Sequence, residues 1–325
     1  MRRHSAAGFS LPELLIAMAI MLAISGAAVT ALLKMTTAQA TIWNRTQMHS
    51  GIRGATEVLQ QEVGQAGRIA LPMSPTTFLP YVVTLAAPVS VGANTVQVDS
   101  TAPIAQARTA GMFVGQRLVV GTGNVQETVI LTAPPTADQI TAVFTNAHNA
   151  GEPILAPGAF GTGIIPPADS PVNYPNGSTG AVLKLYGDIN ADGNMVYIEY
   201  TCDTTTTFNL YRNVVPWNAT SKPAVSASQI LLSNVRPNPN STPCFTYQFA
   251  TVGGNTYVTD VAITLTVRTQ LIDPVTKQFQ DQTKALLNVS PRNTFNAWQM
   301  ASLGIANRIQ PMPPSIVALL PPVSP

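Results

Sequence analysis

One acidic residue, Glu13, stands at the edge of a long apolar run, where its carboxylate lies next to hydrocarbon. Residues 14–33 carry no charged side chain, and about 20 apolar residues are enough to cross a bilayer as a helix. A carboxylate in such a place costs several kcal/mol unless it pairs with a cation or reaches the interface. Because a segment that only anchors or exports a protein has no need for this charge, Glu13 indicates a pairing role.

The residues that flank the apolar run predict its orientation. Arg2, Arg3 and His4 precede the run and Lys34 follows it, so the positive-inside rule places the start in the cytoplasm and the rest outside. Three interpretations compete: a secretory signal cut at the A-x-A-like site over residues 38–40, a plain signal anchor, and a membrane segment that also serves assembly. Only the third accounts for the carboxylate.

The residues RRHSAAG at 2–8, followed by FSLPELL at 9–15, resemble the class III signal of type IV pilins and pseudopilins. The resemblance implies that a prepilin peptidase cuts between Gly8 and Phe9 on the cytoplasmic side, and that Phe9 is then N-methylated. It also implies that Glu13 pairs with the terminal amine of a neighbouring subunit during assembly. Pro12 departs from the aliphatic residue of many family members, but proline is tolerated in a first helical turn.

A helical pattern continues beyond the apolar run. Apolar residues recur at a spacing of three or four, at Met48, Ile52, Ala55, Leu59, Val63 and Ala66. One helix from Pro12 to Gly67 would be about 84 Å long. Glycines at 51, 54 and 64 weaken it and allow bends. The apolar face of this second half needs a covering surface.

After Gly67, prolines end the helical pattern and short β-rich runs follow. We therefore expect an α+β fold, with a long N-terminal membrane-spanning helix and a β-rich globular head that carries an inserted all-β module. The expected parts are a leader (1–8), the long helix (9–67, membrane part about 14–33), a linker (68–80), the inserted β module (81–157), the pilin-like head (158–300) and a Pro-rich tail (301–325). We expect the tail from Arg308 onward to be extended.

Alternation and β-branched residues predict the strands of the head. The expected strands are 95–98, 117–120, 128–131 and 140–144 in the module, and 182–186, 195–201, 208–211, 246–249, 258–268 and 285–289 after it. The phrases NLYRNV at 209–214, VTDVAITLTVRT at 258–269 and VSPRN at 289–293 resemble the heads of PilW-type minor pilins and J-type pseudopilins.

The stretch DINADG at 188–193 matches the first half of a calcium-loop pattern, with Asp188, Asn190 and Asp192 as candidate ligands. Glu199 occupies the last position of the pattern, but in a strand it would lie too far away to close the site. Two interpretations remain open: a hairpin turn that uses the tolerance of Asn and Asp for left-handed geometry, and a calcium site.

Two cysteines, Cys202 and Cys244, are an even number in an exported chain, which favours a disulfide over two buried thiols. Closing a loop of roughly 40 residues stabilises by about 3–4 kcal/mol. Sequence motifs of hydrolases, nucleotide-binding enzymes and zinc proteases are absent, so we expect no enzyme. His148 stands alone beside two asparagines and is expected in a loop.

Charged residues make up 10% of the chain and the net charge is +2, so the composition indicates no nucleic-acid partner. The resemblance implies a minor pilin-type subunit of a type IV pilus or related fibre. A pseudopilin of a type II secretion system and a pilin-anchored adhesive tip protein are the alternatives. The implied partners are other pilin or pseudopilin subunits, the prepilin peptidase, the inner-membrane assembly platform and membrane lipid. The implied location is the bacterial inner membrane with a periplasmic head, and then a pilus or pseudopilus.

Overall fold

The computed structural model describes residues 10–72, 81–103, 106–156, 159–170 and 174–322. The chain folds as two compact units. One comprises Met1–Ser50 with Arg268–Gln282, and the other comprises Gly51–Val267 with Thr283–Pro325.

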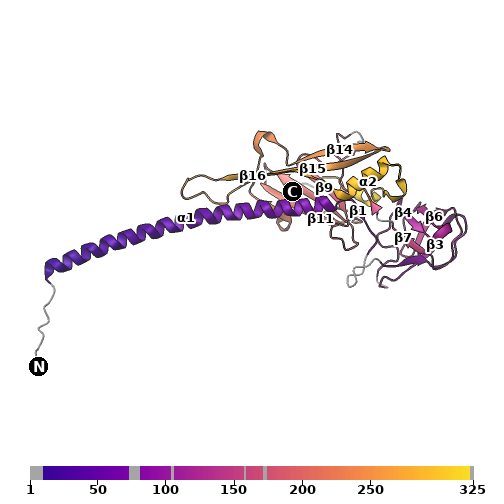
Figure 1. The fold of residues 1–325 in the computed structure, drawn as a ribbon, viewed down its shortest axis with the longest axis horizontal. Helices are drawn as coiled ribbons and strands as arrows, with labels where there is room; N and C mark the ends of the chain where they lie inside the picture. The colour runs from indigo at the N-terminus through magenta and orange to yellow at the C-terminus, as the bar shows by residue number, and fades with distance from the viewer. Residues whose placement is uncertain (1–9, 73–80, 104–105, 157–158, 171–173, 323–325) are drawn as a thin grey trace, which may run out of the picture. The chain divides into compact units, whose positions relative to one another are not determined.

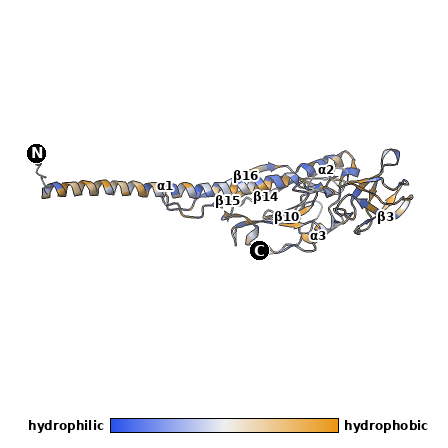
Figure 2. Ribbon diagram, turned by 90° about the horizontal axis from the view of Figure 1, so that it is seen from below, coloured by the Kyte–Doolittle hydropathy of each residue, from blue (hydrophilic) through white to orange (hydrophobic). Residues whose placement is uncertain are grey.

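The longest element is helix α1, Leu11–Gln65, which contributes to both units (Figure 1). Among the described residues, it is the one helix long and apolar enough to cross a membrane. Apolar residues surround its N-terminal half, whereas polar residues are interspersed toward its C-terminal end (Figure 2). The helix ends where Gly67 takes a left-handed φ of 86° and donates its backbone N–H to the carbonyl of Tyr186. The predicted long N-terminal helix is therefore confirmed.

In the first unit, the loop of a β-hairpin contacts α1. The loop spans residues 269–280 and joins β15, Asn255–Arg268, to β16, Asp281–Val289. Figure 1 shows it running along α1 toward the N-terminal part of the helix. The side chain of Asn44 holds the backbone of Leu271 from both sides, donating to its carbonyl at 2.6 Å and accepting from its N–H at 3.3 Å.

In the second unit, six strands between residues 83 and 155 form one antiparallel sheet in the order β5-β4-β7-β2-β3-β6 (Figure 1). The strands are β2 Val83–Leu85, β3 Gly92–Ser100, β4 Arg117–Val120, β5 Glu127–Ile130, β6 Gln139–Phe144 and β7 Pro153–Leu155. Its two edges meet where Leu131 bridges Ala142, so the sheet curls almost into a barrel. Its interior is a core of its own, formed mainly by Val, Leu and Ile side chains.

Two further sheets follow in the same unit. One has the order β12-β11-β10-β9, and in the other β15 pairs with β13, β14 and β16. The remaining strands are β9 Val182–Gly187, β10 Val196–Asp203, β11 Asn209–Pro216, β12 Ile230–Ser233, β13 Val235–Arg236 and β14 Phe245–Val252. The alternating run at 258–268 lies within β15, as its pattern predicts. A long apolar helix followed by a β-rich head with several sheets confirms the expected fold class.

Two short strands join the ends of the barrel-like sheet. β1, Arg68–Ile69, pairs antiparallel with β8, Ala159–Phe160. The chain therefore leaves for the six-stranded sheet and returns from it at neighbouring positions. A disulfide between Cys202 in β10 and Cys244 just before β14 links the other two sheets, as the even cysteine count predicts.

The C-terminal segment is not extended, which corrects the prediction for the tail. Helix α2, Arg292–Ser302, is followed by a second short helix, α3, Pro314–Leu319. Pro314 supplies the fixed φ that suits a first helical turn. The spacing of Ile316, Leu319 and Leu320 then buries all three side chains in a core cluster with Tyr186. The apolar side chains of this segment thus determine its conformation more than its proline content does.

Candidate assembly segment and buried charges of the head

The first turn of α1 presents the carboxylate of Glu13. Ser10 lies just before the helix, and both its backbone N–H and its hydroxyl donate to Oε2 of Glu13, at 3.0 and 2.8 Å. A glutamate at the third helical position that reaches back to the residue before the helix is half of a capping box. Pro12 takes a position whose N–H would have no helical partner. The departure of this proline from the family pattern therefore does not disturb the helix.

Glu13 remains available for a partner. Its side chain is exposed, and within the described residues its Oε1 has no hydrogen-bond partner. Ser10 belongs to the part of the chain that follows the predicted cleavage point, so this cap needs no leader residue. Gly8 and Phe9, the predicted cleavage and methylation residues, lie outside the described residues.

The C-terminal half of α1 is buried in the second unit along the predicted face. Ile52, Ala55, Leu59 and Val63 are all at most 2% exposed. Polar contacts fasten the same stretch to other elements. Lys284 of β16 donates to the Thr56 hydroxyl at 2.8 Å, and Asn293 of α2 donates to the carbonyl of Gln65 at 2.9 Å. The covering surface that the pattern requires is therefore provided by the head itself.

A partly buried ion pair lies beside this apolar face. The Glu62 side chain accepts from Arg212 of β11, with Nε 3.0 Å from Oε1, and from the hydroxyl of Tyr200 on β10. Burial raises the pKa of Tyr200 and the neighbouring Glu62 raises it further, so this phenol is a proton donor throughout the physiological range. Sequence patterns give no signal of this pair, because its members are 150 residues apart.

A second charged cluster holds the C-terminal segment. The ammonium group of Lys184 on β9 donates to the carbonyl of Leu320 at 2.6 Å and to that of Asn176 at 2.8 Å. Glu199 on β10 accepts from Lys222 at 2.6 Å and from Tyr197 at 2.7 Å. Burial lowers the pKa of Lys184, and the nearby Glu199 opposes this shift. These contacts explain why the segment after α3 stays against the head.

The candidate calcium ligands lie in the turn between β9 and β10. Asp188 is buried, its Oδ1 accepts from the backbone N–H of Asp192 at 3.0 Å, and its Oδ2 lies 3.4 Å from Nε of Arg68. Asn190 and Asp192 are exposed. Because an arginine already neutralises the one buried carboxylate, the geometry favours the hairpin-turn interpretation. Among the described residues, no group of three or more His, Cys, Asp or Glu side chains is placed to hold a metal.

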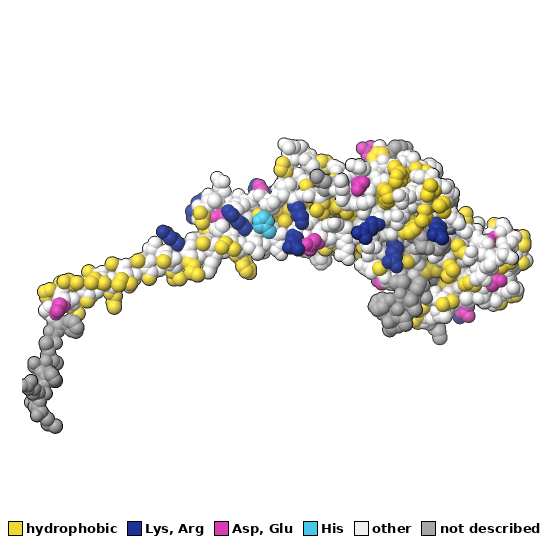
Figure 3. Space-filling view, viewed as in Figure 1, with side chains coloured by type: hydrophobic (Ala, Val, Ile, Leu, Met, Phe, Trp, Pro, Cys, Tyr) yellow, Lys and Arg dark blue, Asp and Glu magenta, His cyan; other side chains and the backbone are white. Residues whose placement is uncertain are grey.

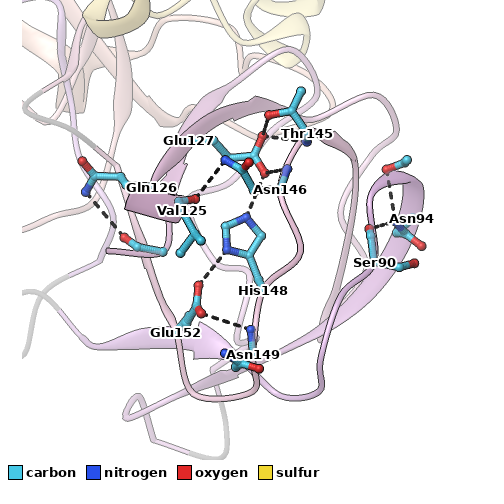
Figure 4. A network of polar contacts seen from close by, with 12 residues as sticks. Ser90, Asn94, Val125, Gln126, Glu127, Thr145, Asn146, His148, Asn149 and Glu152 are labelled. Carbon is cyan, nitrogen blue, oxygen red and sulfur yellow. Dashed lines mark hydrogen bonds and ion pairs between the residues drawn. The ribbon is translucent and has the colours of Figure 1, made fainter. Parts of the chain in front are cut away.

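His148 lies in the loop between β6 and β7, but it is neither exposed nor alone. Its Nδ1 lies 2.7 Å from Glu152 and its Nε2 lies 2.8 Å from Glu127 (Figure 4). Glu127 also accepts from the backbone N–H groups of Thr145 and Asn146, at 2.8 and 2.9 Å. The imidazole therefore ties the start of β5 to the chain before β7. The local sequence gave no signal of this, since one partner is 21 residues away.

The charge state of this network follows from its contacts. Burial alone would lower the pKa of His148, but the bonds to the two carboxylates outweigh it and raise this pKa above 6.5. The pKa of Glu127 is lowered, because the donors from residues 145 and 146 outweigh its burial. The pKa of Glu152 is lowered mainly by the backbone N–H of Asn149 and then by His148. Between the folded pKa values of the carboxylates and that of His148, the imidazolium and both carboxylates are ionised together.

These shifts predict how the stability of the protein depends on pH. The histidine contributes stability below its unfolded pKa of about 6.5, and this is lost as pH rises through its folded pKa. The carboxylates contribute stability above their unfolded pKa of about 4.3, and this is lost as pH falls through their folded pKa values. We therefore expect His148→Gln to lower the free energy of unfolding by about 2 kcal/mol at pH 6, and by less at pH 9. Urea titrations at the two pH values measure this.

The matched control is His49→Gln, which changes an exposed histidine of α1. It should leave the free energy of unfolding unchanged at both pH values. An equal loss for His148→Gln at pH 6 and pH 9 would contradict the assigned ionisation of the network.

Comparison with protein families places a known signal on the first turn of α1 and the residues around it. The model of the prokaryotic N-terminal methylation motif matches residues 3–29. Comparison with curated proteins and with solved structures gives no significant match. The matched residues include Gly8, Phe9 and Glu13, and they continue into the exposed apolar part of α1. The chain therefore carries the class III signal of type IV pilins at the start of a long apolar helix.

Proposed function

We propose that this protein is a minor pilin-type structural subunit of a type IV pilus or a related fibre. The methylation motif supports processing by a prepilin peptidase and assembly with other pilin subunits. The observation that carries the proposal is Glu13, an exposed carboxylate at the start of an apolar helix that, among the described residues, accepts hydrogen bonds from Ser10 alone. The role is one of assembly, without catalysis.

The chemistry of assembly follows from the same residues. Cleavage after Gly8 creates a positive amine on Phe9, and opposite charges attract far more strongly in hydrocarbon than in water. A Glu13 carboxylate that is unpaired in the membrane then gains most when a neighbouring subunit supplies that amine. Apolar side chains cover the N-terminal part of α1 (Figure 3), and this surface suits lipid first and neighbouring helices afterward.

A role as a minor subunit agrees with the size of the head. The six-stranded sheet adds a separately cored module to the head, and such a bulky part is hard to repeat along a dense fibre. A fibre that contained this chain as its main component would contradict the minor role. Fractionation of sheared fibres followed by quantitative mass spectrometry measures the ratio of subunits.

The test of the proposal is the intact mass and the N-terminal sequence of the chain from cells with and without a prepilin peptidase. We expect a mature chain that starts at N-methylated Phe9 only where the peptidase is present. A start near Thr41 in both strains would mean an ordinary secreted protein. An uncut chain in both strains would mean a plain signal anchor, and either result would overturn the proposal.

A further inference from the structure

Polar contacts hold the loop at 269–280 at a fixed position along the axis of α1. Asp273 accepts from the hydroxyl of Thr41 at 3.1 Å and lies 3.7 Å from the guanidinium of Arg45. Its carboxylate is buried and also accepts from the backbone N–H groups of Val275 and Thr276. Together with the bonds of Asn44 described above, these contacts make the loop a formed structure.

This well-held loop exposes large apolar side chains. Leu271 is 70% exposed, Val275 is 65% exposed, and Ile272 and Phe279 are about half exposed. Four such residues within nine positions are far more than a solvated turn needs, and contiguous exposed apolar surface marks a contact with a membrane or a protein.

The position of the loop along α1 indicates a contact with the membrane. Its contacts step from Asn44 to Thr41, toward the N-terminal end of α1, and Thr41 lies about 12 Å beyond Leu33 along the helix. The headgroup layer occupies about 5–8 Å beyond the hydrocarbon, so Thr41 lies about 4–7 Å outside it, a gap of about the length of one long side chain. At the same level, α1 exposes Ile42 and Trp43, at 65% and 74%.

The arrangement of apolar groups around the helix distinguishes contact with a bilayer from contact with a protein partner. Thr41, Asn44 and Arg45 face the loop, and at about 100° per residue Trp43 points roughly half a turn away from them. Apolar groups therefore occur on opposite sides of α1 at one level. A planar interface touches all sides of a helix at one level, whereas a single protein partner covers one side. Tryptophan is also enriched near membrane–water interfaces.

We propose that the 269–280 loop and Trp43 rest on the surface of the bilayer that α1 crosses, in contact with anionic lipid headgroups. Residues 34–50 and 268–282 carry four basic and two acidic side chains, and both acids are already paired, Asp273 with Arg45 and Asp281 with Arg268. Exposed Lys277 at the loop tip and Lys34 then face the headgroups. The inference rests on the membrane insertion of α1 that the proposed function requires.

The experiment attaches a spin label to the full chain in bilayers and measures its collisions with oxygen and with a water-soluble nickel chelate. Thr276→Cys places the label at the loop tip, where only the exposed side chain changes, and Cys202 and Cys244 do not react because they form the disulfide. Val143→Cys, on an exposed position of β6, is the reference for water. Ala23→Cys, inside the apolar run, reports separately on insertion of the helix.

In bilayers of phosphatidylethanolamine and phosphatidylglycerol, we expect the label at 276 to show a several-fold higher ratio of oxygen to nickel collisions than the label at 143. The double change Leu271→Ser and Val275→Ser, at two exposed side chains, should return this ratio to the reference value, and replacing the anionic lipid by phosphatidylcholine should lower it.

A label at 276 that behaves like the one at 143, while the label at 23 is in lipid, would overturn the inference and leave the proposed function standing. A label at 276 that is protected only in isolated fibres would assign the loop to a subunit contact, which also overturns it. A label at 23 in water would mean that the anchor itself, and with it the proposed function, has failed.

Discussion

The Glu13→Gln variant is expected to reach the membrane and to be processed like the native chain, yet to be missing from fibres. Glutamine keeps an oxygen for the bonds from Ser10, so the first turn of α1 stays capped. Only the negative charge is lost. Because opposite charges attract far more strongly in hydrocarbon than in water, loss of this charge should reduce incorporation many-fold.

The measurement is the ratio of this chain in sheared fibres to the same chain in membranes, by quantitative immunoblotting. The matched control is Glu57→Gln, which removes an exposed carboxylate of the same helix that pairs with Arg53 at the surface. Because exposed pairs contribute little, this control should leave incorporation unchanged. Incorporation of Glu13→Gln at the native level would refute the assigned role of this carboxylate.

The second large effect is expected for Glu62→Gln, which should lower the free energy of unfolding by about 2–3 kcal/mol. The substitution leaves the guanidinium of Arg212 half-buried without its carboxylate, and it weakens the bond from the hydroxyl of Tyr200. Because Glu62 lies between buried Leu59 and Val63, loss of the pair should loosen the end of α1 from the sheet beneath it. Denaturant unfolding of the detergent-solubilised chain measures the change.

A double substitution tests whether the charge pair itself is responsible. Replacing a buried ion pair by apolar side chains of similar volume is often neutral, so Glu62→Leu with Arg212→Met should recover most of the lost stability. Glu57→Gln again serves as the surface control, and we expect it to leave the free energy of unfolding unchanged. A double variant as unstable as the sum of its single variants would contradict this account.

Periodic apolar patterns predicted most of the fold. The spacing from Met48 to Ala66 identified the buried face of α1, and the alternation at 258–268 identified the centre of β15. Both patterns are local, since the side chains that share a face recur every 3.6 residues in a helix or every two in a strand. The disulfide was also predictable, because two cysteines in an exported chain allow one pairing.

The buried charges were not predictable in the same way. Glu62, His148 and Lys184 have polar side chains that the pattern places at the surface, and each is buried because a partner distant in the sequence meets it. Pairing over 21 to 150 residues leaves no periodic trace. The C-terminal helix α3 was missed for a related reason, since the pocket for Ile316 exists only after the sheets have formed.

The pairing of β1 with β8 has a consequence for how this protein can evolve. Arg68 is in register with Phe160 and Ile69 with Ala159, so the two ends of the intervening segment are a strand pair apart. A loop of almost any length can bridge such a gap at small entropic cost. The barrel-like sheet can therefore be lost, exchanged or diversified by recombination, while the helix that must match every neighbouring subunit stays the same.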